Sequence, residues 1–95
     1  MIELSVIIPT RNRAELLKRT LDSIMEQDLP QEYFEVIVIN NGSTDNTADI
    51  CRIYQKKIRN FQYFLEEEPG LHVGRHHGML ASRSDCLVYA DDDIR

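Results

Sequence analysis

The stretch Glu35-Val36-Ile37-Val38-Ile39-Asn40-Asn41-Gly42-Ser43-Thr44-Asp45 decides the fold, because a run of apolar residues ends there at a polar turn. The run does not alternate with polar residues, so it predicts a strand buried on both faces, as in parallel sheets. A hairpin turn at Asn41-Gly42 is an alternative, but a helical pattern follows instead of a second strand. The loop either presents the Asn41 amide to a ligand or serves only as a turn with a helix cap from Ser43 or Thr44.

Three further apolar runs repeat this pattern on both sides of the stretch. They cover residues 4–8, 61–65 and 86–90, and the helical patterns between the runs cover residues 12–27, 46–58 and 71–83. The expected order is therefore β-α-β-α-β-α-β. Right-handed crossovers then give a Rossmann-like α/β fold, with a mainly parallel sheet and helices on both faces.

The first two predicted helices would bury an apolar face, whereas the third would bury a row of small residues. The apolar positions of the first and second are, respectively, Leu17, Leu21 and Ile24, and Cys51, Tyr54 and Ile58. Asn12 is the predicted N-cap of the first helix, with Glu15 completing a capping box. The third helix carries a row of small residues, Gly74, Gly78 and Ala81, which would let it approach another backbone or a ligand closely.

Length and charge exclude several classes of protein. Ninety-five residues form one small domain, and 16 acidic against 11 basic residues give a net charge of −5, which argues against binding nucleic acid. Cys51 and Cys86 are expected to be free thiols that pack as small buried hydrophobes. The start of the chain does not resemble a signal peptide, and no apolar run approaches the ~20 residues of a membrane span. We therefore expect a cytoplasmic protein.

The residues that follow the strands are the candidate site, because ligands of open α/β sheets bind at the carboxyl ends of the strands. The sharpest feature is Asp91-Asp92-Asp93, directly after the last apolar run. Three adjacent carboxylates repel one another, and a hard divalent cation such as Mg²⁺ relieves that repulsion. Asp91 and Asp93 point the same way in an extended chain. An Asp-rich turn or helix start is the structural alternative.

Basic residues near the third helix suggest further contacts. His72 and His76 share a helical face, but no third or fourth ligand stands nearby to complete a zinc site. Arg75 on the glycine-interrupted helix suits a diphosphate through its fork of donors, whereas a plain surface arginine is the simpler interpretation.

Four motifs in order resemble the inverting family-2 glycosyltransferases of GT-A fold. They are Ser5-Val6-Ile7-Ile8-Pro9-Thr10-Arg11-Asn12, Val36-Ile37-Val38-Ile39-Asn40-Asn41-Gly42-Ser43-Thr44-Asp45, Gly70-Leu71-His72-Val73-Gly74-Arg75-His76-His77-Gly78 and Tyr89-Ala90-Asp91-Asp92-Asp93. The resemblance covers essentially the whole chain. It implies that residues 1–95 are the N-terminal, donor-nucleotide-binding half of a GT-A domain. It also implies that Asp91-Asp92-Asp93 is the family's DxD motif, shortly before residue 95.

The resemblance also assigns site residues and ligands. It implies that the base pocket is lined by Pro9, Thr10 and Arg11 and that Asn41 stands where the family has a base-contacting carboxylate. It places Arg75 near the base and diphosphate, Asp91 and Asp92 on ribose or metal-bound water, and Asp93, with Asp91, on Mg²⁺ or Mn²⁺. Many members have an aromatic residue where Arg11 stands.

The partners implied are a nucleotide-diphosphosugar donor, with a UDP-sugar expected, and an unknown sugar or lipid acceptor. The general base is expected beyond residue 95, so we expect no transfer by this chain alone. The full-length protein is expected to be cytoplasmic or peripheral at a membrane, and a bare sheet edge invites self-association.

Two other classes of protein place acidic residues at strand ends. A Mg²⁺-binding doubly wound regulatory or binding domain of the phosphoacceptor kind needs a Lys after a later strand, and no Lys follows Lys57. It remains the alternative without transferase activity. A phosphatase-like hydrolase needs a nucleophilic Asp after the first strand, where Pro9-Thr10 stand.

Overall fold

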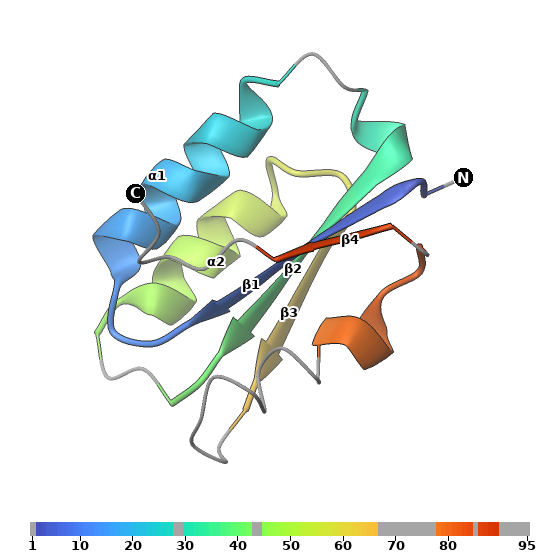
Figure 1. Cartoon of the computed structure of the whole chain (residues 1–95). Coiled ribbons are helices and arrows are strands. Elements are labelled where there is room, and N and C mark those ends of the chain that lie inside the picture. Colours follow the sequence, from blue (N-terminus) through green and yellow to red (C-terminus); the bar gives the residue numbers. More distant parts are fainter. Residues whose placement is uncertain (1, 28–29, 43–44, 67–77, 85, 90–95) are drawn as a thin grey trace.

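The computed structural model describes residues 2–27, 30–42, 45–66, 78–84 and 86–89 of the chain (Figure 1). Its elements, in chain order, are β1 (Leu4–Thr10), α1 (Ala14–Met25), a 3-10 turn η1 (Gln31–Tyr33), β2 (Phe34–Asn40), α2 (Thr47–Gln55), β3 (Phe61–Leu65) and β4 (Leu87–Tyr89). Residues 78–81 add a short helical segment before β4. The predicted order of elements is therefore confirmed, except that residues 71–77 of the third helix lie outside the described residues. None of the helices described is long and apolar enough to cross a membrane.

The four strands form one sheet in the order β3-β2-β1-β4, and every neighbouring pair is parallel. Thr10 at the end of β1 pairs with Asn40 at the end of β2, and Asn40 pairs with Leu65 at the end of β3. The carboxyl ends of three strands therefore meet at one edge of the sheet. This confirms the predicted α/β architecture.

The main core lies between the sheet and α1 and α2, which both cover the same face (Figure 1). Alternate strand residues face this layer, among them Val6, Ile8, Val36 and Val38, and the helices add Leu17, Leu21, Cys51 and Tyr54. Each of the valine, leucine and isoleucine side chains contributes about 1.5–3 kcal/mol when it is fully buried. The predicted apolar faces of the first two helices are thus confirmed.

Residues 78–81 lie against the opposite face of the sheet (Figure 1). Ile7, Ile37 and Ile39 form a second buried cluster here. Gly78 packs directly on Ile7: a Cβ added at Gly78 would lie 2.2 Å from the Ile7 Cγ2 atom. The predicted close approach of the small-residue row is therefore confirmed for Gly78, as a contact with the sheet, whereas Gly74 lies outside the described residues.

Helix capping differs from the prediction. The N-cap position of α1 is Arg13 and not Asn12, and it makes no side-chain capping hydrogen bond. Asn12 adopts φ 54°, a left-handed conformation that Asn tolerates better than most residues. The prediction of a capping box from Asn12 and Glu15 is wrong, because Asp45 accepts a hydrogen bond from the first amide of α1 instead. Ser43 and Thr44 lie outside the described residues.

The two cysteines also differ from each other. Both are free; Cys51 is buried in the core, and burial raises its thiol pKa to about 12. Cys86 is exposed just before β4, so the prediction that it is buried is wrong. Cys86 directly precedes β4, which lies at the end of the described strand order and pairs there with β1.

Glu35 is a buried acid within the apolar run of β2, with no exposed surface. Its carboxylate accepts hydrogen bonds from Ser5 Oγ (2.6 Å), Gln62 Nε2 (2.9 Å), and the backbone N and Nε of Arg83 (2.6 and 3.0 Å). Burial by itself raises the pKa of Glu35, but these hydrogen bonds outweigh burial and lower it. Glu35 therefore joins β1, β2 and β3 to the segment that leads into β4.

Candidate functional site

The candidate site lies where β1 and β2 end side by side. The backbone N–H of Asn41 donates to the carbonyl of Thr10 at 2.9 Å, and that of Glu66 donates to the carbonyl of Asn40 at 2.8 Å. These bonds continue the parallel pairing past the strand ends, so the loops after β1, β2 and β3 leave the sheet from one edge. This edge is where ligands of open α/β sheets bind.

Four predicted site residues come together at this edge. Pro9 and Thr10 are buried at the end of β1, Asn41 is only 6% exposed directly after β2, and Arg11 is exposed beside them. The juxtaposition follows from the register, because Pro9 and Thr10 pair with Ile39 and Asn40. The edge thus combines the buried polar groups of Thr10 and Asn41 with the exposed side chain of Arg11.

Tyr63 adds a polar contact that sequence reasoning missed. The side-chain amide of Asn40 donates to the Tyr63 hydroxyl at 2.8 Å, between neighbouring strands β2 and β3. Asn40 is 2% exposed, and a buried amide of this kind is costly unless it is hydrogen bonded. The presence of a tyrosine in the third apolar run was the only sign of this contact in the sequence, and it did not specify Asn40 as the partner.

Asp45 ties the two loops of the site together. One carboxylate oxygen accepts a hydrogen bond from the backbone N–H of Ala14, the first residue of α1, at 3.2 Å. The other accepts from the N–H and hydroxyl of Thr47, the first residue of α2, at 3.1 and 2.5 Å. The first amides of a helix lack partners within the helix, so a single side chain satisfies the starts of two helices.

The electrostatic environment of position 45 favours an acidic side chain. Partial burial raises the pKa of Asp45, but the hydrogen bonds from Thr47 and Ala14 outweigh it and lower the pKa. The carboxylate therefore remains ionised at neutral pH. A negative charge beside two helix N-termini is favourable, since each terminus carries a partial positive charge.

Gly42 makes the turn after Asn41 possible. Its φ is +70°, in the region that favours glycine, and an added Cβ would meet no atom within 4 Å. Any L-residue here would be strained although there is room for its side chain. The predicted glycine-dependent tight turn is confirmed.

The remaining predicted site residues lie outside the described residues: Arg75, Asp91, Asp92 and Asp93, as well as His72 and His76. Within the described ranges, no group of three or more His, Cys, Asp or Glu side chains could hold a metal ion. The proposed metal site therefore depends on the chemistry of the Asp triplet alone.

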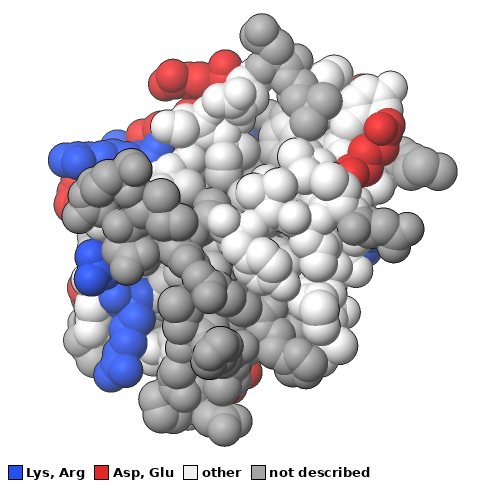
Figure 2. All heavy atoms as spheres, in the orientation of Figure 1, with Lys and Arg blue, Asp and Glu red and all other residues white. Residues whose placement is uncertain are grey.

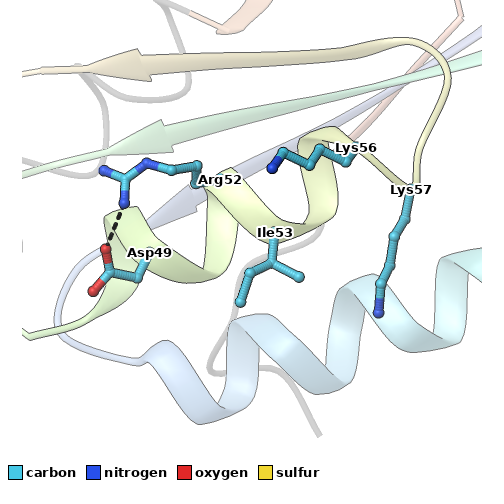
Figure 3. A pocket seen from close by; sticks show the side chains of 5 residues that line it. All are labelled: Asp49, Arg52, Ile53, Lys56 and Lys57. Carbon is cyan, nitrogen blue, oxygen red and sulfur yellow. Dashed lines mark hydrogen bonds and ion pairs between the residues drawn. The ribbon is translucent and has the colours of Figure 1, made fainter.

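Charged side chains are unevenly distributed over the molecule. Figure 2 shows positive side chains gathered on the side of α1 and α2, and mostly uncharged atoms on the side of β4. On the outer surface of α2, a groove of about 440 Å³ is lined by Asp49, Arg52, Ile53, Lys56 and Lys57 (Figure 3). Arg52 Nη1 donates to Asp49 at 2.8 Å. None of the predicted site residues lines this groove, so it is separate from the strand-end site.

Comparisons with known proteins agree with this geometry. The model of the family described as Glycosyl transferase family 2 matches residues 5–95. Validoxylamine A glucosyltransferase of Streptomyces hygroscopicus subsp. jinggangensis is 40% identical over 93 residues, which cover 96% of this chain and 22% of that protein.

Two solved structures are also similar. S. aureus TarS 1-349 in complex with UDP has a TM-score of 0.90 at 30% identity, covering 97% of this chain and 28% of that one. The mannosyltransferase PcManGT from Pyrobaculum calidifontis, in complex with GDP-Man and Mn²⁺, has a TM-score of 0.88 at 30% identity, covering 96% of this chain and 27% of that one. The chain thus spans less than a third of each relative.

Proposed function

Because this chain belongs to glycosyl transferase family 2 and has a partial GT-A fold, we propose that it is the donor-binding half of an enzyme that transfers a sugar from a nucleotide-diphosphosugar to an acceptor. One observation carries the proposal. The loops after β1 and β2 are fixed against each other by Asp45 at the carboxyl edge of a parallel sheet. A rigid, polar pair of loops at this edge suits a nucleotide.

A UDP-sugar is the proposed donor. TarS is described in complex with UDP and PcManGT in complex with GDP-Man, so structures of this kind accommodate more than one base. Pro9, Thr10 and Arg11 would line the base pocket. The Asn41 side chain can both accept and donate hydrogen bonds, so it would orient the base through its polar edge.

The diphosphate requires positive charge as it leaves the sugar. Arg75 would stabilise the negative charge that develops on the diphosphate, through its forked donors. Asp91 and Asp93 would hold Mg²⁺ or Mn²⁺, since adjacent carboxylates suit hard cations, and the bound cation would neutralise the departing diphosphate. Asp92 would contact the ribose. PcManGT, with Mn²⁺ and GDP-Man in one complex, supports the use of a metal.

Activation of the acceptor requires a general base, worth about 10²–10⁴-fold in rate. We assign the base and the acceptor site to parts of such a protein that this chain does not cover, because it spans less than a third of the validoxylamine A glucosyltransferase, TarS and PcManGT chains. The acceptor is a sugar or lipid that these residues do not specify.

Calorimetric titration tests the proposal. UDP and GDP are titrated into the chain with Mg²⁺, with Mn²⁺ and with a chelator, and we expect weak binding that requires the metal. The Asp93→Ala variant should lose that binding without losing the fold, because removing one of three clustered carboxylates relieves repulsion. Equal affinity in chelator would contradict the metal role, and no binding of either nucleotide would contradict the donor site.

A further inference from the structure

A polar cavity lies at the opposite edge of the sheet, where the strands begin. Its volume is about 380 Å³, and it is lined by Arg59, Asn60, Phe61, Gln62, Ala81 and Arg83. These residues begin β3 and precede β4. At ~3.3 Å per residue, the length of a strand separates the cavity from the donor site by about 15 Å. The cavity is thus spatially separate from the proposed donor site.

Arg83 is fixed in place at this cavity by the buried Glu35. The carboxylate accepts from the backbone N of Arg83 at 2.6 Å and from its Nε at 3.0 Å. The terminal nitrogens of Arg83 have no partner among the described residues, and the side chain is 55% exposed. The guanidinium is therefore oriented in advance, with two donor groups left for a ligand.

Arg59 lines the same cavity from a segment that is also fixed. Its backbone N donates to the side chain of Gln31 at 2.6 Å, and the Asn60 amide donates to the carbonyls of Gln31 and Phe34 at 3.0 and 3.3 Å. No described residue forms a hydrogen bond or ion pair with the Arg59 guanidinium. Among the described residues, the cavity is thus lined by two arginines and by no acid, while Glu35 contacts Arg83 from the buried side of the sheet.

This excess positive charge points to an anion, although the whole chain carries a net charge of −5. Two planar forks of donors match a phosphate group, whose several oxygens can accept from both arginines. The volume lies within the range of small-molecule sites. We propose that the cavity at Arg59 and Arg83 binds the phosphate group of a small molecule, as a second site apart from the donor nucleotide.

The test is a titration of the isotope-labelled chain with inorganic phosphate, followed by NMR. Saturable shifts are expected for Asn60, Gln62 and Ala81. Arg59→Gln should weaken binding about tenfold, because one charge-assisted pair of hydrogen bonds is lost. Arg59 is exposed and its backbone bonds do not involve the side chain, so this variant should fold.

Arg52→Gln is the matched control, because it removes the same charge from a residue on α2 (Figure 3). Arg52 is not among the residues that line the cavity. It should leave phosphate binding unchanged. Equal weakening by both substitutions, or no saturable shift, would overturn the proposal. Acetate binding as tightly as phosphate would overturn it in favour of a carboxylate or acidic-peptide site. UDP displacing phosphate from these residues would show that the cavity is not a second site.

Discussion

At the scale of single residues, two acids with different surroundings organise this molecule. Asp45 bridges the starts of α1 and α2 near solvent, whereas Glu35 is fully buried and joins three strands to the segment before β4. Asp49 is a useful contrast, because it lies in the first turn of α2 but, among the described residues, its side chain pairs only with the exposed Arg52. The structural role of each acid thus depends more on its hydrogen-bond partners than on its charge.

Asp45→Ala should reduce both the free energy of unfolding and the affinity for nucleotide. Loss of a helix cap typically costs about 1 kcal/mol, and here two helix starts lose their acceptor. The two loops should also separate, which would weaken UDP binding in the presence of metal. Denaturant unfolding and calorimetry measure the two effects.

Asp49→Asn is the control for this prediction. It changes the charge of the same helical turn, but removes only an exposed ion pair that is worth well under 1 kcal/mol. Asp45→Asn should fall between the two, because an amide has one accepting oxygen for two sets of donors. Identical unfolding and binding in Asp45→Ala and Asp49→Asn would refute the bridging role.

Glu35 should make stability depend on pH. Its pKa is lower in the folded chain than in the unfolded chain, so at acidic pH the unfolded chain binds more protons. Its contribution is therefore complete above the unfolded pKa, about 4.3, and is lost as pH falls through the folded pKa.

Glu35→Gln should cost about 1–3 kcal/mol at pH 7, because an amide leaves some of the donors unpaired. The difference in unfolding free energy between native chain and variant should shrink below pH 4. Urea unfolding at pH 7, 5, 4 and 3 measures it. A difference that stays constant with pH would mean that Glu35 does not titrate as described.

At the scale of elements, the two faces of the sheet are covered in different ways. α1 and α2 pack as amphipathic helices, and the Tyr54 hydroxyl donates to Asp22 between them. Burial and the contact with Asp22 raise the Tyr54 pKa to about 12, so the hydroxyl keeps its proton and the bond persists at neutral pH. The other face is covered by the segment 78–81, which lies close enough to touch Ile7 only because residue 78 is glycine.

Gly78→Ala should therefore destabilise the chain by about 1–2 kcal/mol. The overpacking against Ile7 costs about 1–3 kcal/mol, and the better helix propensity of Ala returns at most about 1 kcal/mol. Thermal or urea unfolding gives the value. In an Ile7→Ala background the cost should largely disappear, because the clashing Cγ2 is gone; an equal cost in both backgrounds would argue against this contact.

At the scale of the whole molecule, β4 is an edge of the sheet and pairs, among the described strands, only with β1. Val88 and Tyr89 are 45% and 37% exposed. An apolar edge strand is a template for pairing with another chain.

We expect the 95-residue chain to dimerise as its concentration rises, which sedimentation velocity can measure. Val88→Lys places a charge on this edge and should shift the equilibrium toward the monomer, whereas the exposed Ile53→Lys on α2 should not. A chain that is monomeric at high micromolar concentration, or that responds equally to both substitutions, would contradict association through β4.

The parallel α/β architecture and the strand-end position of the polar loops were predictable from the amino-acid sequence. Those features depend on runs of five to ten neighbouring residues, such as Val36–Ile39 and its turn, whose periodicity is a local property. The third helix, expected over residues 71–83, is described as helical over residues 78–81, and Arg75 and the Asp triplet remain predictions.

Only the tertiary structure decided which side chains hold these local elements together. The sequence suggested Asn12 as the cap of α1, but the acceptor is Asp45, 31 residues away from Ala14. Likewise, the sequence does not explain an acid at position 35 in an apolar run. The folded chain does, because Ser5, Gln62 and Arg83 donate hydrogen bonds to the Glu35 carboxylate. A buried polar group is stable only when partners reach it, and those partners come from distant parts of the chain that strand order and register bring together.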